Sequence, residues 1–161
     1  ILLNIFRIII GDCFMIIRDF LLSDLDDVVR IEYEAFDDPY PVGILLQLYN
    51  AGAGFLVAQV AQTIVGYVIF WIKEGQGHII VIAVDSNYQD MKVGSLLLEK
   101  ACFIFKRNNI NTVFLEVRKS NIRAINFYKR NGFVKINEED DYYNDGESAI
   151  IMQYSNYDDC I

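Results

Sequence analysis

Three apolar, β-branched runs follow one another in the middle of this chain: FLVAQV, TIVGYVIFWI and GHIIVIAV, between residues 55 and 84. Such runs favour extended backbone. Only Ala61 and Gln62 separate the first two runs, and an EGQG turn precedes the third, which is typical of strands joined by tight turns. The sequence therefore predicts three neighbouring antiparallel strands, and any fold must be built around them.

Helical patterns lie before and after these strands. Ser23 is a good N-terminal cap for the helix DLDDVVRIEYEAF, whereas Pro39 and Pro41 hold the DDPYP segment extended, so a second helix is expected only from about Val42. A third helix is predicted by apolar residues that recur at helical spacing, namely Val93, Leu97, Ala101 and Ile104.

The remaining chain continues the alternation of strands and helices. TVFLEV reads as a strand, NIRAINFYKR as a short helix that ends at Asn131 and Gly132, and FVKI and SAIIMQY as two final strands. We therefore predict a mixed α+β fold.

Length and composition indicate one domain. The chain has 161 residues, of which 53% are hydrophobic, enough for a substantial core. We expect residues 1–14 to be an N-terminal extension, with an extra strand or an apolar tail as the alternatives, residues 15–154 to be the domain, and residues 155–161 to be a short acidic tail. The apolar start is interrupted by Arg7 and Asp12, lacks a cleavage site and is too short to cross a bilayer, so we expect neither a signal peptide nor a membrane anchor.

Charge and cysteine content exclude several classes of function. The formal net charge is -8 and no basic cluster occurs, which argues against a nucleic-acid partner. The cysteines, Cys13, Cys102 and Cys160, lack the paired spacing of a disulfide framework or a metal site. We expect a cytoplasmic protein that needs no metal.

The segment YQDMKVGSLLLEK, which follows the third strand, is the first candidate binding site. It contains a glycine turn and then opens a helix, and the free N–H groups and partial positive charge of a helix start suit a phosphate group. By itself, one glycine before an amphipathic helix is more often only a turn.

The segment TVFLEVRKSNIRAINFYKRNGF contains two residues suited to proton transfer, Glu116 and Tyr128. Strand alternation puts Glu116 on the face opposite Val113, Leu115 and Val117. Simpler interpretations exist: Glu116 pairs with Arg118 in solvent, and Tyr128 packs against the sheet. Asn121, likewise, serves only as a helix cap in the simpler interpretation.

Taken together, these motifs resemble the GNAT superfamily of N-acetyltransferases, in its ribosomal-protein-alanine acetyltransferase (RimI-like) branch, whose archaeal members also resemble N-terminal acetyltransferases. The resemblance runs from about Met15 to Tyr154 and includes EAFDDPYP, HIIVIAV, LEVRKSN, AINFYKRNGF and YYNDGESA. It implies a mixed, mostly antiparallel central sheet flanked by helices, with acetyl-CoA in a V-shaped opening between central strands. Lys92 departs from the family motif, because it stands at the first glycine position of the cofactor loop.

The resemblance also implies roles for individual residues in a direct transfer of acetyl from acetyl-CoA to an amine. Glu116 matches the base that takes a proton from the amine, and Tyr128 matches the acid that protonates the departing thiolate. Backbone N–H groups at the end of the third strand stabilise the oxyanion. The implied cofactor-binding residues are Ile82, Ala83, Val84, Gln89, Asp90, Met91, Lys92, Val93, Gly94, Ser95 and Asn121.

Acceptor binding is expected at the DDPYP and YYNDGESA loops. The candidates are Asp38, Tyr40, Tyr142 and Tyr143, although tyrosines in loops often only cover the edge of a core. His78, the one histidine of the chain, begins an apolar strand, and we exclude it from catalysis.

Three functional classes remain open. The leading prediction is acetylation of the N-terminal α-amine of proteins, with ribosomal proteins among the candidate substrates. The alternatives are acetylation of a small-molecule amine and a non-enzymatic CoA-binding sensor. Retention of both Glu116 and Tyr128 argues against the sensor, and the YYNDGESA loop argues against the small amine by resemblance.

Overall fold

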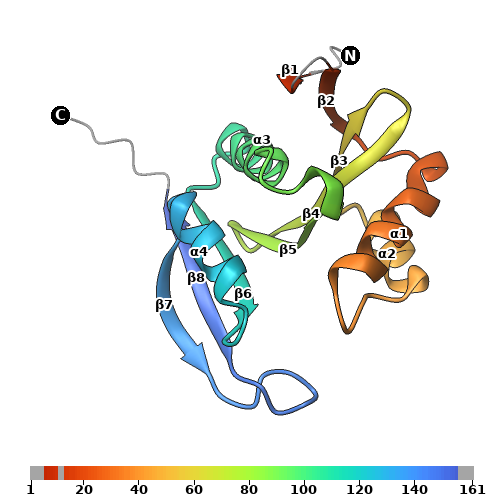
Figure 1. Ribbon diagram of the computed structural model, residues 1–161. Helices are drawn as coiled ribbons and strands as arrows, with labels where there is room; N and C mark the ends of the chain where they lie inside the picture. Colours follow the sequence, from red (N-terminus) through yellow and green to blue (C-terminus); the bar gives the residue numbers. More distant parts are fainter. Residues whose placement is uncertain (1–5, 11–12, 156–161) are drawn as a thin grey trace. The chain divides into compact units, whose positions relative to one another are not determined.

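The structure is a computed structural model that describes residues 6–10 and 13–155 (Figure 1). These residues form two compact units. The described part of residues 1–70 and Val81–Phe103 make up the first, and Trp71–Ile80 and the described residues from Ile104 onward make up the second. Two strands and one helix contribute residues to both units.

The first unit contains four strands paired in sequence order. β1 pairs with β2, β2 with β3 and β3 with β4, all antiparallel, and the end of β5 follows β4 in the strand order. The elements are β1 (Phe6–Ile10), β2 (Cys13–Asp19), the 3-10 helix η1 (Leu22–Asp24), α1 (Leu25–Ala35), α2 (Val42–Asn50), β3 (Gly54–Val60), most of β4 (Thr63–Lys73), the end of β5 (Gln76–Val84), the 3-10 helix η2 (Ser86–Tyr88) and most of α3 (Val93–Arg107).

The core of the first unit lies on both faces of β4. Residues 64–70 of this strand are all buried, which requires cover on each face. Gly66 faces α3, because a Cβ atom there would lie 3.1 Å from Val93 and 3.2 Å from Leu97. The next residue, Tyr67, bonds to Glu32 of α1. Since successive strand residues point to opposite faces, α1 and α3 cover opposite faces of β4.

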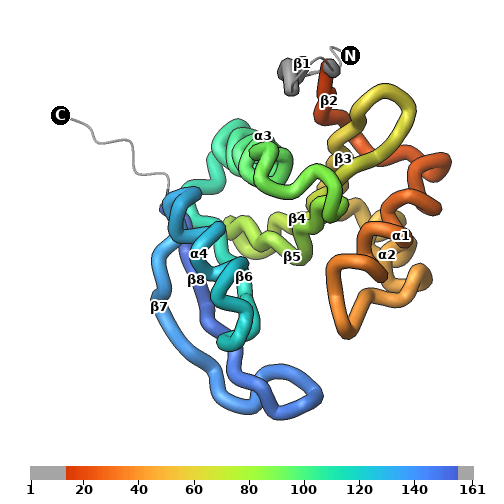
Figure 2. The backbone as a smooth tube through the Cα atoms, in the orientation of Figure 1, coloured from red at the N-terminus to blue at the C-terminus, as the bar shows by residue number. Residues whose placement is uncertain are grey.

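The second unit contains the remaining strand pairs. β5 pairs with β6 in parallel, while β6 and β7 each pair antiparallel with β8, so the strand order is β5-β6-β8-β7. Figure 2 traces the loop of residues 140–148, which connects β7 to β8, as the blue excursion at the bottom. The elements found only in this unit are β6 (Thr112–Arg118), α4 (Ile122–Arg130), β7 (Val134–Glu139) and β8 (Ala149–Ser155).

Most expected elements are present. The Ala61–Gln62 hairpin, the late start of α2 at Val42 and the alternating burial of β6 are confirmed. The helix α4 ends at Arg130, and the expected Asn131 and Gly132 follow it, Gly132 with a left-handed φ of 88°. The mixed α+β class is confirmed, and of the strand pairings described only β5 with β6 is parallel.

Two local expectations were wrong. Ser23 does not cap α1, because the preceding turn forms η1 and the carboxylate of Asp24 instead accepts the Leu21 N–H at 2.8 Å and pairs with Arg18 at 2.7 Å. In α3 the last buried apolar residue of the turn is Phe105, which is fully buried, whereas Ile104 is only partly buried.

The structure can be compared with the expected domain limits near the N-terminus. Five residues of the expected extension form β1, and β2 begins at Cys13, before the expected domain start at Met15. The expectations for residues 1–5, 11–12 and 156–161 concern positions outside the described residues. Within the described residues, no helix is both long and apolar enough to cross a bilayer.

Candidate active site

Glu116 lies on the more accessible face of β6. Val113, Leu115 and Val117 are buried, while the residues between them are only partly covered. The side chain of Glu116 keeps 25% of its surface exposed. A carboxylate in this position is accessible to a substrate and can also form hydrogen bonds with neighbouring side chains.

His78 holds that carboxylate. The parallel register of β5 and β6 sets His78 opposite Phe114, and its Nε2 lies 2.6 Å from Oε2 of Glu116. An ionised carboxylate only accepts hydrogen bonds, so the ring donates through Nε2–H when Glu116 is charged. Sequence reasoning missed this contact, although alternation along β5 could have indicated that His78 shares the half-exposed face of the sheet. Its exclusion from catalysis stays a prediction.

Tyr128 lies on the buried side of α4. It is 8% exposed, and its ring packs edge-on against Phe127 and Phe133. Burial raises the pKa of the Tyr128 phenol well above its usual value, and the nearby Tyr143 adds to the increase. A tyrosine hydroxyl carries its proton at physiological pH, as a proton donor requires.

Asn121 has the structural role that the simpler interpretation gave it. Its side-chain oxygen accepts the Ala124 N–H at 3.0 Å and so caps α4. The cap sets where α4 begins, and hence where Tyr128 lies along the helix. A contact between Asn121 and the cofactor stays a prediction.

Arg118 ties the loop between β7 and β8 to the strand that carries Glu116. Its Nη1 donates to Asp145 and to Glu147, at 2.8 Å each, and its guanidinium stacks 4.0 Å above the ring of Tyr143. Hydrogen bonds from Ser120, and then from Arg118, lower the pKa of Glu147 to about 2. Tyr142 packs against Tyr143 with ring centroids 5.0 Å apart. Both candidate tyrosines thus belong to a loop fastened to β6.

The turn Gln89–Lys92 in the first unit has the conformation of an anion site. Asp90 and Lys92 are both left-handed, with φ of 62° and 63°, and α3 begins immediately after them. Alternating left-handed residues turn successive N–H groups toward a common concavity, and the helix start adds its own free N–H groups. The residues present therefore fit the pyrophosphate of CoA. Lys92 takes up the backbone conformation that a glycine would favour.

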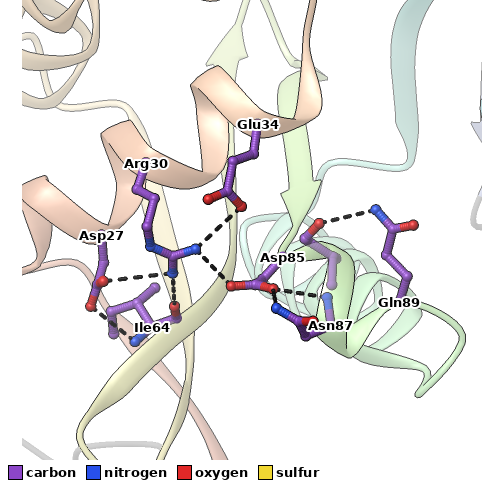
Figure 3. A network of polar contacts seen from close by, with 8 residues as sticks. Asp27, Arg30, Glu34, Ile64, Asp85, Asn87 and Gln89 are labelled. Atoms are coloured by element: carbon purple, nitrogen blue, oxygen red, sulfur yellow. Dashed lines mark hydrogen bonds and ion pairs between the residues drawn. The ribbon is translucent and has the colours of Figure 1, made fainter.

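A polar network positions the start of this turn (Figure 3). Asp85, which directly follows β5, is 5% exposed; it accepts the Asn87 N–H at 2.9 Å and pairs with Arg30 of α1 at 2.7 Å. The amide of Gln89 donates to the carbonyl of Val84 at 3.3 Å. The ion pair between Arg30 and Asp85 thus connects helix α1 to the segment that follows β5. Sequence reasoning did not single out Arg30 or Asp85.

The other predicted substrate residues lie in the first unit, in the loop between α1 and α2. Asp38 is exposed and Tyr40 is 39% exposed. The proton-transfer candidates and the double tyrosine thus belong to the second unit, and the cofactor turn and the DDPYP loop belong to the first. Among the described residues, no group of three or more His, Cys, Asp or Glu side chains is placed to hold a metal ion.

The sequence profile of the acetyltransferase (GNAT) family matches residues 22–133. This chain belongs to the GNAT family. An N-acetyltransferase of Methanocaldococcus jannaschii is 40% identical over 140 residues, covering 86% of this GNAT chain and 90% of that protein. An N-alpha-acetyltransferase of Sulfurisphaera tokodaii is 35% identical over 150 residues, covering 84% and 90%.

A solved structure agrees with these relatives. The crystal structure of the ribosomal-protein-S18-alanine N-acetyltransferase from Escherichia coli matches with a TM-score of 0.80 and 27% identity, over 88% of this chain and 93% of that one. The fold of this GNAT protein is therefore the family fold, as the sequence predicted. The protein is an acetyl-CoA-dependent acyltransferase of the RimI-like and archaeal N-acetyltransferase type.

Proposed function

We propose that this GNAT enzyme acetylates the N-terminal α-amine of proteins. The observation that carries the proposal is the attachment of the double-tyrosine loop to β6. Arg118, two residues beyond the proposed base on the same strand face, holds Tyr143 by stacking and the loop acids by hydrogen bonds. Paired, partly exposed aromatic rings on a loop held by the strand that carries the base suit an extended peptide end. The name of the Sulfurisphaera tokodaii relative supports the same class of acceptor.

Glu116 and Tyr128 divide the proton transfers in this proposal. Bound acetyl-CoA supplies the activated acetyl group, and backbone N–H groups of residues 82–84 and 90–95 bind its carbonyl and its pyrophosphate. Glu116 takes a proton from the ammonium group of the acceptor, which leaves the neutral amine that attacks the thioester, and His78 orients the Glu116 carboxylate at 2.6 Å. The hydroxyl of Tyr128 donates its proton to the departing thiolate. The proposed setting is the cytoplasm.

Among proteins, ribosomal proteins are the more specific substrates that we propose. This part of the proposal comes from the similarity to the Escherichia coli ribosomal-protein-S18-alanine enzyme. The remaining proposed contacts, those of Asn121 with the cofactor and of Asp38 and Tyr40 with the acceptor, depend on the same family resemblance.

The test is a transfer assay with acetyl-CoA and a panel of peptides that differ in their first residue, including ribosomal-protein N-termini. Each peptide is paired with a version whose α-amine is blocked. Free thiol reports the rate, and mass spectrometry locates the acetyl group. We expect acetyl on the α-amine only. Acetyl found only on lysine side chains, or only on small amines, would overturn the proposal.

Variants test the assigned roles in the same assay. Glu116→Gln and Tyr128→Phe should each lower the rate by roughly two to four orders of magnitude, the usual range for a general base or acid. Glu99→Gln and Tyr33→Phe change exposed residues and are the matched controls. Unchanged rates in the Glu116 and Tyr128 variants would remove these residues from the mechanism.

A further inference from the structure

Glu32 is a buried acid that the proposed proton transfers do not use. It lies on α1, retains 1% of its surface, and has both carboxylate oxygens occupied. Oε1 accepts the backbone N–H of Tyr40 at 2.7 Å, and Oε2 is bonded to the hydroxyl of Tyr67 in β4. One side chain thus joins the central strand to the DDPYP loop.

Burying this carboxyl group carries a cost. An acid removed from water is destabilised unless hydrogen bonds replace its hydration, and burial raises the pKa of Glu32 to about 7. An apolar residue would fill the same space without that cost. The acid is therefore best explained by the hydrogen bonds that it makes.

The sequence of the DDPYP loop explains why a hydrogen-bond acceptor is needed beside Tyr40. Pro39 and Pro41 have no N–H, so the N–H of Tyr40 is the one backbone donor of this Pro-Tyr-Pro segment. Residues 36–41 belong to no helix or strand. The bond from Tyr40 to Glu32 therefore ties the middle of the loop to the core.

The bond fixes the backbone of Tyr40, while the residue as a whole keeps 39% of its surface exposed. The two prolines restrict the backbone on either side. A side chain on a restricted and anchored backbone starts from a fixed position, which lowers the entropy lost when a ligand binds to it.

We propose that Glu32 is a positioning residue for the acceptor peptide, acting through the backbone of Tyr40, with Tyr67 holding the carboxylate in place. The proposal rests on the proposed function, because it assumes a peptide acceptor at the DDPYP loop. It assigns Glu32 no contact with the reacting atoms.

Two substitutions of Glu32 separate positioning from folding. Glu32→Gln keeps an oxygen for the Tyr40 N–H and offers an amide donor to the Tyr67 hydroxyl. Glu32→Ala removes both bonds, and Tyr67→Phe removes only the inner one. Glu34→Gln and Glu34→Ala repeat the chemical changes on the same helix at a side chain that is 47% exposed.

The first measurement is hydrogen exchange of the Tyr40 amide in the full chain, which needs no substrate. We expect strong protection in the parent protein and in Glu32→Gln, loss of protection in Glu32→Ala, and partial loss in Tyr67→Phe. Protection in a thermally stable Glu32→Ala variant would overturn the proposed anchor.

The second measurement is steady-state kinetics at pH 8 with peptides that start with Ala, Ser or Met, together with CoA affinity by calorimetry. Glu32→Ala should raise the peptide KM about tenfold, the size of one hydrogen bond to a charged group, with kcat and CoA affinity little changed. Glu32→Gln should restore the parent KM. A fall in kcat at unchanged peptide KM would overturn the positioning role.

The outcomes also distinguish this proposal from the proposed function. If no peptide is acetylated by the parent protein, the proposed function fails. A protected Tyr40 amide in that case makes Glu32 a structural anchor only, which overturns the positioning proposal as well. If peptides are acetylated and the Glu32 variants match the Glu34 controls, the proposed function stands and this inference alone fails.

Discussion

Lys92 shows how one residue can keep a loop conformation that its side chain does not favour. The left-handed backbone, φ 63°, costs an L-residue roughly 1–2 kcal/mol relative to glycine. Glycine would avoid this cost but lose more conformational entropy on folding, roughly 0.5–1 kcal/mol. The turn accordingly has a glycine-like conformation without the glycine of the family motif.

Lys92→Gly should therefore raise the free energy of unfolding by about 0.5 kcal/mol, the difference between these two effects. Urea denaturation measures the change. Met91→Gly is the matched control, because Met91 lies in the same turn without a positive φ and should lose stability. A destabilised Lys92→Gly would mean that the lysine side chain itself stabilises the turn.

At the scale of elements, two arginines connect segments that are far apart in the sequence. Arg118 connects β6 to the loop between β7 and β8, and Arg30 connects α1 to the end of β5. Each connection involves one proposed binding region: the acceptor loop for Arg118 and the cofactor turn for Arg30. Their substitution should affect different substrates.

Arg118→Ala should raise the peptide KM about tenfold or more and leave CoA affinity unchanged, because the tyrosine loop loses its stacking and its charged hydrogen bonds. Arg118→Lys should recover only part of the effect, since an ammonium lacks the planar guanidinium that stacks on Tyr143. Steady-state kinetics and calorimetry measure the two effects. Arg130→Ala, an exposed arginine at the end of α4, is the control. Equal losses for peptide and CoA would argue that the change is global.

Arg30→Met should weaken CoA binding several-fold and lower stability by roughly 1–3 kcal/mol, because the buried carboxylate of Asp85 loses its cation. Calorimetric titration with CoA and urea denaturation report the two changes. Glu34→Gln removes a weaker partner of Arg30, at 3.3 Å, and leaves the Asp85 pair intact. Unaltered CoA affinity in Arg30→Met would separate this ion pair from the cofactor turn.

The stability of the whole molecule should depend on pH through Glu32. Burial raises the pKa of Glu32 from 4.5 to about 7, so between these values the folded state keeps a proton that the unfolded chain has released. The free energy of unfolding therefore falls as pH rises through this window. Asp24, Asp85 and Glu147 have lowered pKa values and titrate below it.

Between pH 4.5 and 8, the free energy of unfolding of the parent protein should fall by up to about 3 kcal/mol relative to that of Glu32→Gln, which cannot ionise. Urea denaturation of both proteins at several pH values gives the difference. Parallel curves would show that Glu32 ionises equally in the folded and unfolded states.

Much of the fold follows from local chemistry that the sequence displays. β-branched runs, short turns, Pro39 and Pro41, and the glycine after α4 predicted most strands and helices, because extended backbone, restricted φ and left-handed turns depend on neighbouring residues. Side-chain alternation likewise predicted that Glu116 lies on the face of β6 opposite Val113, Leu115 and Val117. The family motifs supplied the expected roles of Glu116 and Tyr128.

Tertiary structure decided which distant groups meet. His78 bonds to a carboxylate 38 residues away, and Glu32 to a hydroxyl 35 residues away. Asp24 pairs with Arg18 across a turn, so the helix begins later than Ser23 predicted. Such contacts depend on strand register and on which faces of a sheet the helices cover, and neither is encoded in a short window of sequence. By itself the sequence thus determined most helices and strands and the residues suited to proton transfer. Only the tertiary structure determined which residues these side chains contact.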